Sequence, residues 1–480
     1  MLFNSVQFLI FFVIITILFF ILKHKYRWIL LLIASSIFYI TFIPPYIFIL
    51  LALILIDYTA GIYIEKSQDK KRKLFLLISI LSTATVLFIF KYFNFFNVNL
   101  LELASFLHWN YSIKTLNLIL PVGLSFHTFQ SLSYVIEVYK GRFKAEKNLG
   151  IYSLYVMFFP QLVAGPIERP QNLLHQFYEE HKFDLPQIVE GLQLMLWGFF
   201  LKVVIADRLA LIVNQVYNNV SAYTGIPLIL STYLFTFQIF CDFAGYSIIA
   251  IGCARVLGFK LMDNFKRPYF SKSIQEFWRR WHISLSTWFK DYVYIPLGGN
   301  RVRKSKIILN IMIVFLISGL WHGAAWTFVI WGALHGMFIV ISTKTINFRE
   351  KFCNFIKLNR FPKIHNLIKI LITFNLVAFG WIFFRANSLS DSLYVITHLF
   401  QGWNINFLQD SLTFGKTELI IIFFLILFME LVHYVQEKKG IRNCWDRIPP
   451  LFRMVIYIIF ILFILLFGIF ENTKFIYFQF

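Results

Sequence analysis

Long apolar segments, separated by short basic or proline-containing turns, recur along this chain. The clearest are 4–22, 28–43, 46–64, 74–91, 307–321, 326–343, 366–384, 417–435 and 451–470. A helix needs about 20 apolar residues, with about 17 as the lower limit, to cross a bilayer, so these segments predict membrane spans. The first is apolar from Val6 to Leu22, without a preceding basic region or a cleavage site, which indicates a retained span and not a signal peptide.

The polarity of the turns predicts an orientation. Basic clusters occur at 23–27, 66–73 and 140–147, whereas the turn between the second and third spans is the uncharged Pro44-Pro45. Cytoplasmic turns carry an excess of Lys and Arg. We therefore expect an outside N-terminus and three cytoplasmic clusters, as in a multi-pass protein of the inner (cytoplasmic) membrane.

The middle of the chain, about residues 116–305, breaks this regular pattern. Its apolar stretches contain Pro121, Gly123, Pro160, Gly165, Pro166, Glu168, Asp242 and Gly245. Irregular backbone and ionisable groups survive at membrane depth only when they are buried in protein or line a wet cavity. We therefore expect broken or re-entrant helices in the interior, with the terminal spans as an outer wall.

We interpret residues 1–480 as one membrane-embedded domain. It comprises N-terminal outer spans (1–115), a core (116–345) and C-terminal spans (346–480). No soluble domain, internal repeat or low-complexity linker interrupts it.

Composition supports this class. Hydrophobic residues make up 59% of the 480 residues and charged residues only 14%, against about 25% charged in a soluble domain. The net charge of +21 comes from basic turns, so positive-inside topology explains it better than nucleic acid does. Four cysteines lack CxxC or metal-ligand spacing, which indicates small core residues and neither a disulfide framework nor a metal site. They are Cys241, Cys253, Cys353 and Cys444.

Three of the eleven histidines, His127, His282 and His322, lie in apolar surroundings dense enough to suggest a reaction site. His322 stands between two predicted spans whose far ends are both basic, which places it at the turn in the outer half of the membrane. Histidine titrates near neutral pH and can act as a general base toward a hydroxyl. Gly319 and Gly323 allow close approach of a substrate or a helix. A histidine that joins two helices by hydrogen bonds explains the local pattern equally well.

His282 lies in an aromatic and basic segment, 277–288. If this segment is one helix, Trp278 and His282 share a face, while Trp281 and Trp288 line a neighbouring face. Such a helix suits the wall of a passage at the membrane interface, although an anchor of Trp and Arg is the favoured interpretation.

Arg279 and Arg280 stand beside these aromatic residues, in a basic stretch from 259 to 306. Guanidinium groups recognise phosphate and carboxylate, and a basic cytoplasmic surface attracts a polyanionic donor such as coenzyme A. Positive-inside bias alone would also produce this stretch.

Two further polar residues stand at membrane depth. His127 follows Pro121 and Gly123, which indicate a helix start or a break, and packing is its favoured role. Asp242 is an intramembrane acid and therefore a functional candidate. Pairing with a buried Arg or Lys, which would hold helices together, is the equal alternative.

Seven blocks follow one another along the chain. They are Leu120–Phe126, Phe159–Ile167, Asp242–Ser247, Asn264-Phe265, Phe277–Ser286, Tyr294–Asn300 and Leu320–Gly323. Together they resemble the membrane-bound O-acyltransferase family, and within it the bacterial branch that acetylates alginate and other exopolysaccharides. The resemblance covers about residues 1–400, and the C-terminal spans agree only in hydropathy.

The resemblance implies about eleven spans around a wet funnel. In that family the histidine of the Trp-His-Gly block, here His322, is essential, and the other signature histidine matches His282. The local patterns, and not the resemblance, give the candidates for substrate or donor binding, which are Trp278, Arg279, Arg280, Trp281, Trp321 and Asp242. No metal and no bound cofactor are implied, and acetyl-CoA or another acyl thioester is the co-substrate.

The predicted reaction places the donor on the cytoplasmic side and an acceptor hydroxyl in the outer funnel, with His322 taking the proton. The acceptor in this branch is often a periplasmic or extracellular SGNH-type acetyltransferase that completes transfer to polysaccharide. One alternative is the sister branch that passes D-alanine from a carrier protein toward teichoic acid, whose members are typically shorter. Another is a proton-coupled transporter, although the two related halves typical of transporters are not found.

Overall fold

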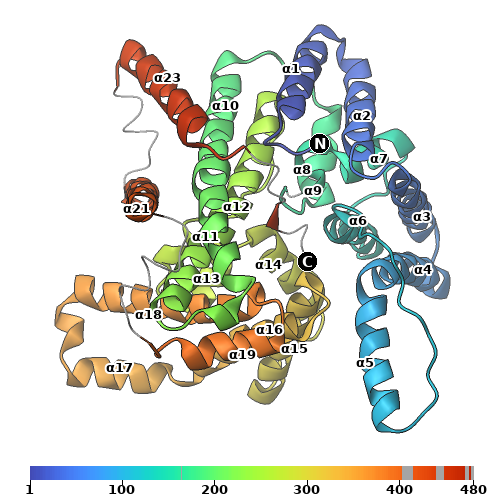
Figure 1. Ribbon diagram of the computed structural model, residues 1–480. Helices are drawn as coiled ribbons and strands as arrows, with labels where there is room; N and C mark the ends of the chain where they lie inside the picture. Colours follow the sequence, from blue (N-terminus) through green and yellow to red (C-terminus); the bar gives the residue numbers. More distant parts are fainter. Residues whose placement is uncertain (164, 403–414, 439–447, 471–474, 477–480) are drawn as a thin grey trace. The chain divides into compact units, whose positions relative to one another are not determined.

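A computed structural model describes residues 1–163, 165–402, 415–438, 448–470, 475 and 476, and all the regular structure within these residues is helical (Figure 1). This confirms the all-α class.

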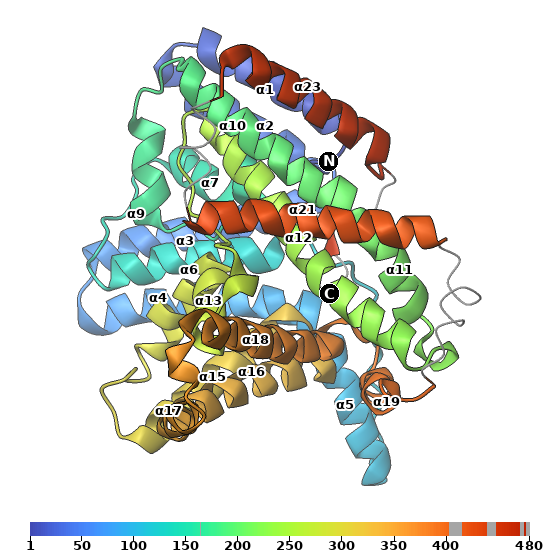
Figure 2. The same ribbon diagram turned by 90° about the vertical axis from the view of Figure 1, so that its left-hand side faces the viewer.

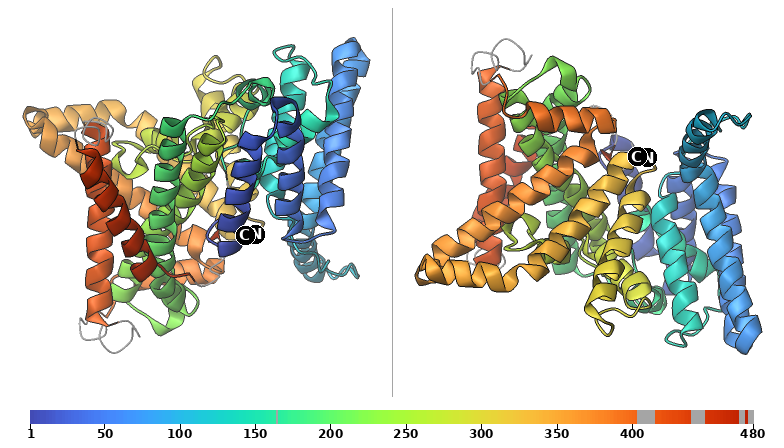
Figure 3. Two further views of the ribbon diagram at one scale, coloured as in Figure 1. Left: turned by 90° about the horizontal axis from the view of Figure 1, so that it is seen from above. Right: turned by 90° about the horizontal axis from the view of Figure 1, so that it is seen from below.

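The N-terminal third forms helices at the four predicted apolar segments and one further helix, α5, that was not predicted. They are α1 (Val6–Ile21), α2 (His24–Ile40), α3 (Tyr46–Lys66), α4 (Asp69–Leu87), the π turn η1 (Phe88–Tyr92) and α5 (Phe93–Phe106). The fourth predicted span is therefore part of a longer helix of 38 residues. The π turn bends it, so that α4 and α5 point in different directions (Figures 1 and 3).

The middle third contains short, interrupted helices and one long helix. They are α6 (Leu124–Tyr139), α7 (Leu149–Met157), α8 (Phe159–Leu162), α9 (Pro170–Leu173), η2 (Leu174–Tyr178), α10 (Leu185–Phe199), the π segment η3 (Phe200–Ala206), α11 (Asp207–Tyr217), η4 (Val220–Ala222), α12 (Ile226–Val256), η5 (Pro268–Phe270), α13 (Ile274–Arg280), α14 (Ile283–Phe289) and η6 (Lys290–Tyr294). In the most apolar 18-residue window of α12, 83% of the residues are buried, against 11% in that of α4–α5. The interior position predicted for the middle of the chain is confirmed for α12.

The C-terminal third again forms long helices. They are α15 (Lys304–His322), α16 (Trp326–Lys344), α17 (Ile346–Phe355), η7 (Leu358–Arg360), α18 (Pro362–Arg385), α19 (Leu389–His398), α21 (Lys416–Lys438) and α23 (Pro450–Phe467). Within the described residues, eight helices are long and apolar enough to cross a membrane, namely α3, α4–α5, α12, α15, α16, α18, α21 and α23. Multi-pass membrane structure is confirmed, and the count of about eleven spans stays a prediction.

Contacts divide the chain into two compact units. The first comprises 1–195, 247–263 and 323–325, and the second comprises 196–246, 264–322 and 326–480. The division of the chain into outer spans, core and C-terminal spans stays a prediction.

The first unit contains a polar interior. Asp57 of α3 accepts a hydrogen bond of 2.6 Å from Ser79 of α4. Helix α6 begins after Gly123, whose φ of +75° explains the glycine, so the helix start predicted there is confirmed. His127 lies buried on α6, and the packing role favoured for it stays a prediction.

The second unit contains the α15, α16 and α18 helices, which lie side by side (Figure 2). Glycines explain the close packing of the first two, because a Cβ at Gly319 would lie 2.3 Å from the Phe328 carbonyl oxygen. Of the cysteines, Cys241 and Cys253 are buried, as expected for small core residues, whereas Cys353 is only half-buried, so the expectation is wrong for it. Cys444 lies outside the described residues.

Candidate functional site

His322 is the last residue of α15 and is 3% exposed. Its ring centroid lies 4.8 Å from that of Trp321, 5.0 Å from that of Trp331 on α16, and 5.4 Å from that of Phe384 on α18. We call these three side chains around His322 the aromatic cage. The predicted position of His322, at the turn between two apolar helices, is confirmed.

His282 does not lie within one helix, so the prediction of a continuous helix over 277–288 is wrong. Helix α13 ends at Arg280, α14 begins at Ile283, and His282 between them has a left-handed backbone with φ +42°. A residue other than glycine rarely adopts this backbone conformation. Such strain persists only where surrounding contacts hold it.

The contacts that hold this corner come from residues 264–266. The Ile283 amide donates to the Asn264 carbonyl oxygen (2.9 Å), and the Lys266 amide donates to the Arg280 carbonyl oxygen (2.9 Å). The Ser284 hydroxyl donates to the Asn264 side-chain oxygen (2.6 Å). Backbone partners on both sides of His282 thus replace the helical hydrogen bonds that a continuous helix would form.

The corner brings His282 to the aromatic cage. Its ring is fully buried, 4.6 Å from the ring of Phe243 and 6.2 Å from that of Trp321. Trp321 therefore touches both histidines. Burial lowers the pKa of His282 to about 3, so its imidazole is neutral at physiological pH and can accept as well as donate a hydrogen bond.

The two tryptophans before His282 face different partners. Trp278 contacts Trp331 of α16, a member of the aromatic cage, at a centroid distance of 5.7 Å. Trp281 contacts Trp381 of α18 at 5.1 Å. Trp278 and His282 thus have different neighbours, because the corner turns the chain between them.

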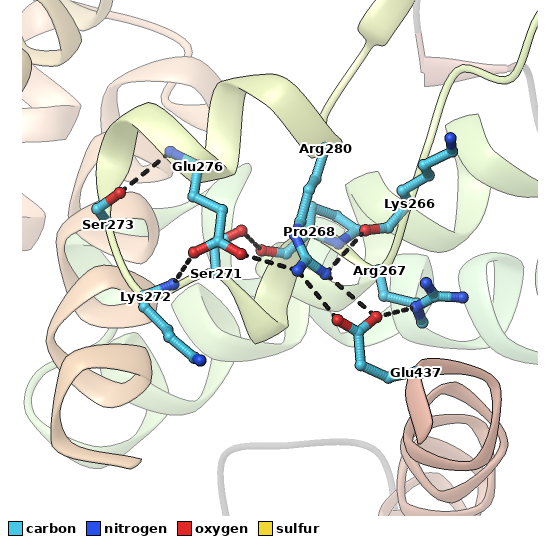
Figure 4. A network of polar contacts seen from close by, with 9 residues as sticks. All are labelled: Lys266, Arg267, Pro268, Ser271, Lys272, Ser273, Glu276, Arg280 and Glu437. Atoms are coloured by element: carbon cyan, nitrogen blue, oxygen red, sulfur yellow. Dashed lines mark hydrogen bonds and ion pairs between the residues drawn. The ribbon is translucent and has the colours of Figure 1, made fainter. Parts of the chain in front are cut away.

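Arg279 and Arg280 differ in what they contact. Arg280 pairs with Glu276 (2.8 Å) and with Glu437 of α21 (3.0 Å), and Arg267 also pairs with Glu437 (2.5 Å; Figure 4). Arg279 is exposed, and no ion pair with it occurs within the described ranges. Arg279 is therefore the more accessible of the two to an anionic donor.

A capping pattern explains the start of α13. The Ser273 hydroxyl accepts from the Glu276 amide (3.1 Å), and the Glu276 carboxylate accepts from the Lys272 amide (2.9 Å; Figure 4). Serine followed by glutamate three residues later is a known helix-start signal. The same glutamate pairs with Arg280 one turn later, so side chains of this segment stabilise both the start and the end of α13.

Asp242 pairs with a buried cation, as one of the two interpretations of it expected, and a role in donor binding stays a prediction. Lys202 of η3 lies 2.6 Å from Asp242 of α12 and 2.8 Å from Asp207 of α11. The Ile476 amide also donates to Asp242 (2.7 Å). All three charged side chains are at most 4% exposed. We call Lys202, Asp207 and Asp242 the ion cluster.

Sequence reasoning missed three residues at this site. Lys202 and His335 are ionisable residues inside apolar stretches, and this pattern alone indicates candidate functional residues. His335 of α16 is fully buried, with its ring 5.0 Å from that of Trp331. Trp331 itself offered no signal, because tryptophan is common in membrane helices.

Comparison with known sequences identifies related proteins. The sequence model for the membrane-bound O-acyltransferase family matches residues 148–386, a range that contains both histidines and the cage. The chain is 34% identical over 483 residues to the probable alginate O-acetylase of Pseudomonas putida, covering 96% of each protein. It is 36% identical over 395 residues to the peptidoglycan O-acetyltransferase of Helicobacter pylori, covering 76% of this chain and 72% of that protein.

A teichoic acid D-alanyltransferase is a more distant relative. The Bacillus subtilis protein is 31% identical over 283 residues, which cover 56% of this chain and 69% of that protein. The D-alanyl alternative therefore has less support than O-acetylation.

Proposed function

This chain belongs to the membrane-bound O-acyltransferase family, and we propose that it moves an acetyl group from a thioester donor to a hydroxyl for O-acetylation of a cell-surface polysaccharide. The observation that carries the proposal is the meeting of His282 and His322 on Trp321. Two imidazoles beside one indole, enclosed by apolar side chains, are suited to moving a proton where water is scarce.

In the proposed reaction His322 is the general base. It removes the proton of the acceptor hydroxyl while that oxygen attacks the acyl carbonyl carbon, and the thiolate that leaves takes the proton back. The neutral His282 orients the reacting group by hydrogen bonding. The donor is acetyl-CoA or another acyl thioester, and no bound cofactor takes part.

The proposed orientation puts the donor in the cytoplasm and the acceptor outside the inner membrane. The supporting observation is the exposed Arg279 at the end of α13, in the basic stretch expected to face the cytoplasm. The proposed acceptor is a periplasmic or extracellular SGNH-type acetyltransferase, or the polysaccharide itself.

The decisive experiment replaces His322 by Ala. We expect acetyl ester in the surface polysaccharide, measured by NMR, to fall by about 10²- to 10⁴-fold, the usual contribution of a general base. His398→Ala is the matched control, because His398 lies at the end of α19 and contacts Tyr394. Membrane insertion of both variants should equal that of the parent protein. Unchanged acetylation in His322→Ala would refute the assignment, and D-alanyl ester in place of acetyl would favour the alternative donor.

Access to His322 is a second requirement, because the side chain is 3% exposed. A cysteine at position 322 should react with a membrane-impermeant thiol reagent added from outside, and acetyl-CoA should slow that reaction. The parent protein, labelled in parallel, accounts for the native cysteines. If the thiol of the His322→Cys variant reacts with the reagent from neither side of the membrane, a reaction at this ring is contradicted.

A further inference from the structure

We propose that the indole N–H of Trp331 donates a hydrogen bond to the acyl carbonyl oxygen and stabilises the negative charge that develops there during transfer. This inference rests on the proposed acyl transfer at His322. It adds to His322 and His282 a catalytic residue that acts on the donor carbonyl and not on the acceptor.

The position of Trp331 is the first reason. Its ring is fully buried and stands at 88° to the ring of His322, with the two centroids 5.0 Å apart. A carbonyl carbon attacked by an oxygen that hydrogen-bonds His322 must lie within a few ångströms of the cage. Trp331 therefore borders the place where the oxyanion forms.

The hydrogen-bonding state of Trp331 is the second reason. Its Nε1 is buried and has no hydrogen-bond partner in the part of the chain that the structure describes. Buried donors are almost always paired, and one that is not needs an explanation. Phe384, another cage member, has no polar atom, so it cannot supply a donor. A role as hydrogen-bond donor to a reacting carbonyl explains why the indole N–H of Trp331 is buried without a partner among the described residues.

The neighbours of Trp331 hold its ring still. Its ring stacks on Trp381 at 5.7 Å and 19°, and contacts Phe384 at 5.2 Å and His335 at 5.0 Å. A donor fixed before the reaction begins stabilises charge without reorganising. The aromatic packing therefore supplies the rigidity that an oxyanion donor requires.

The step is balanced by the groups already named. The acceptor oxygen forms a bond to the carbonyl carbon, its proton passes to His322, and the carbonyl π electrons move to the oxygen that Trp331 binds. When the C–S bond breaks, those electrons re-form the carbonyl and the thiolate takes the proton from His322. Trp331 keeps its own proton throughout, as expected for an indole.

The test replaces the indole without changing its shape. Benzothienylalanine, introduced at position 331 by amber suppression, keeps the two fused rings and removes only the N–H. The same substitution at position 381 is the matched control, because Trp381 is equally buried and stacks on Trp331. Trp331→Phe is a further variant that needs no unnatural residue.

The measurement is incorporation of radiolabelled acetyl-CoA into surface polysaccharide by permeabilised cells, normalised to folded protein, over a range of donor concentrations. For the 331 variants we expect the maximal rate to fall about 10²- to 10³-fold, as for the loss of one oxyanion donor. The half-saturating acetyl-CoA concentration and the pH profile should stay unchanged, because a ground-state or purely structural role would alter them. The 381 variant should keep its rate within about threefold.

Two results would overturn the inference. One is a maximal rate at benzothienylalanine 331 within threefold of the parent, and the other is an equal loss at positions 331 and 381. If either result is found and the His322→Ala variant is inactive, only the oxyanion role of Trp331 is rejected and the proposed function stands. An active His322→Ala variant rejects the proposed function as well.

Discussion

The aromatic cage and the ion cluster both bury polar groups in the second unit, but they do so in opposite ways. In the ion cluster every charged side chain has an opposite charge within 3 Å, through Lys202. In the cage, His322 is surrounded by three aromatic rings. Both are almost completely removed from solvent.

The difference separates stability from chemistry. Buried charges survive when they are paired, and removing one partner costs far more than the pair contributes. Neutral imidazole and indole groups pay a smaller desolvation penalty, so a buried donor such as the indole N–H of Trp331 can remain available to a substrate. Under the proposed function we therefore expect Asp242, a candidate for donor binding in the sequence, to stabilise the fold and the cage to take part in the reaction.

The largest effect on stability should come from the ion cluster. Lys202→Met leaves two buried carboxylates without their cation, which should cost about 3–5 kcal/mol of folding free energy. The measurement is the thermal unfolding midpoint in detergent, together with the specific activity of the folded fraction. Adding Asp242→Asn and Asp207→Asn to Lys202→Met should recover part of the loss. Equal stability of Lys202→Met and the parent would remove the contrast between the two regions.

A smaller effect is expected beside the cage. A Cβ at Gly380 of α18 would lie 2.8 Å from Nε2 of His335, so Gly380→Ala must displace that ring or the helix. Overpacking of this kind costs about 1–3 kcal/mol, and the ring of Trp331, in contact with His335, should shift with it. We expect lower activity per folded molecule, whereas Lys202→Met should lower stability and leave the activity of the folded fraction unchanged. An alanine that lowers stability but leaves the activity of the folded fraction intact would argue against coupling between His335 and the cage.

The ion pairs of Glu437 should contribute less, because this carboxylate is 32% exposed. Glu437→Gln removes the charge that binds Arg267 and Arg280, and a partly exposed pair contributes about 0.2–1 kcal/mol. The unfolding midpoint should fall slightly and activity should stay near that of the parent. A large loss of activity would show that α21 positions the His282 corner more strongly than its exposure suggests.

The smallest change in stability is expected at Arg279, an exposed residue whose replacement by Ala should alter folding free energy by less than about 0.5 kcal/mol. If Arg279 binds the phosphates of the donor, its loss should raise the half-saturating acetyl-CoA concentration. Arg280→Ala, in contrast, should lower stability, since Arg280 is held by two carboxylates. A donor dependence identical to that of the parent would exclude Arg279 from donor binding.

Local patterns were sufficient for the membrane helices and for the position of His322. Apolar length predicts a span without knowledge of its neighbours, and α15 and α16 therefore appear where the segments 307–321 and 326–343 predicted them. The seven blocks likewise indicated an acyltransferase, because a family resemblance depends on residue identities along the chain and not on contacts between helices.

Partners distant in the chain decided the remainder. Whether Asp242 meets a cation depends on Lys202, forty residues earlier, and the left-handed backbone of His282 depends on Asn264. The role of Trp331 emerges from helices α15, α16 and α18 packing together. Periodicity describes which face of a helix is apolar, but the pairing of buried polar groups is a property of contacts between helices, so it became visible only in the folded chain.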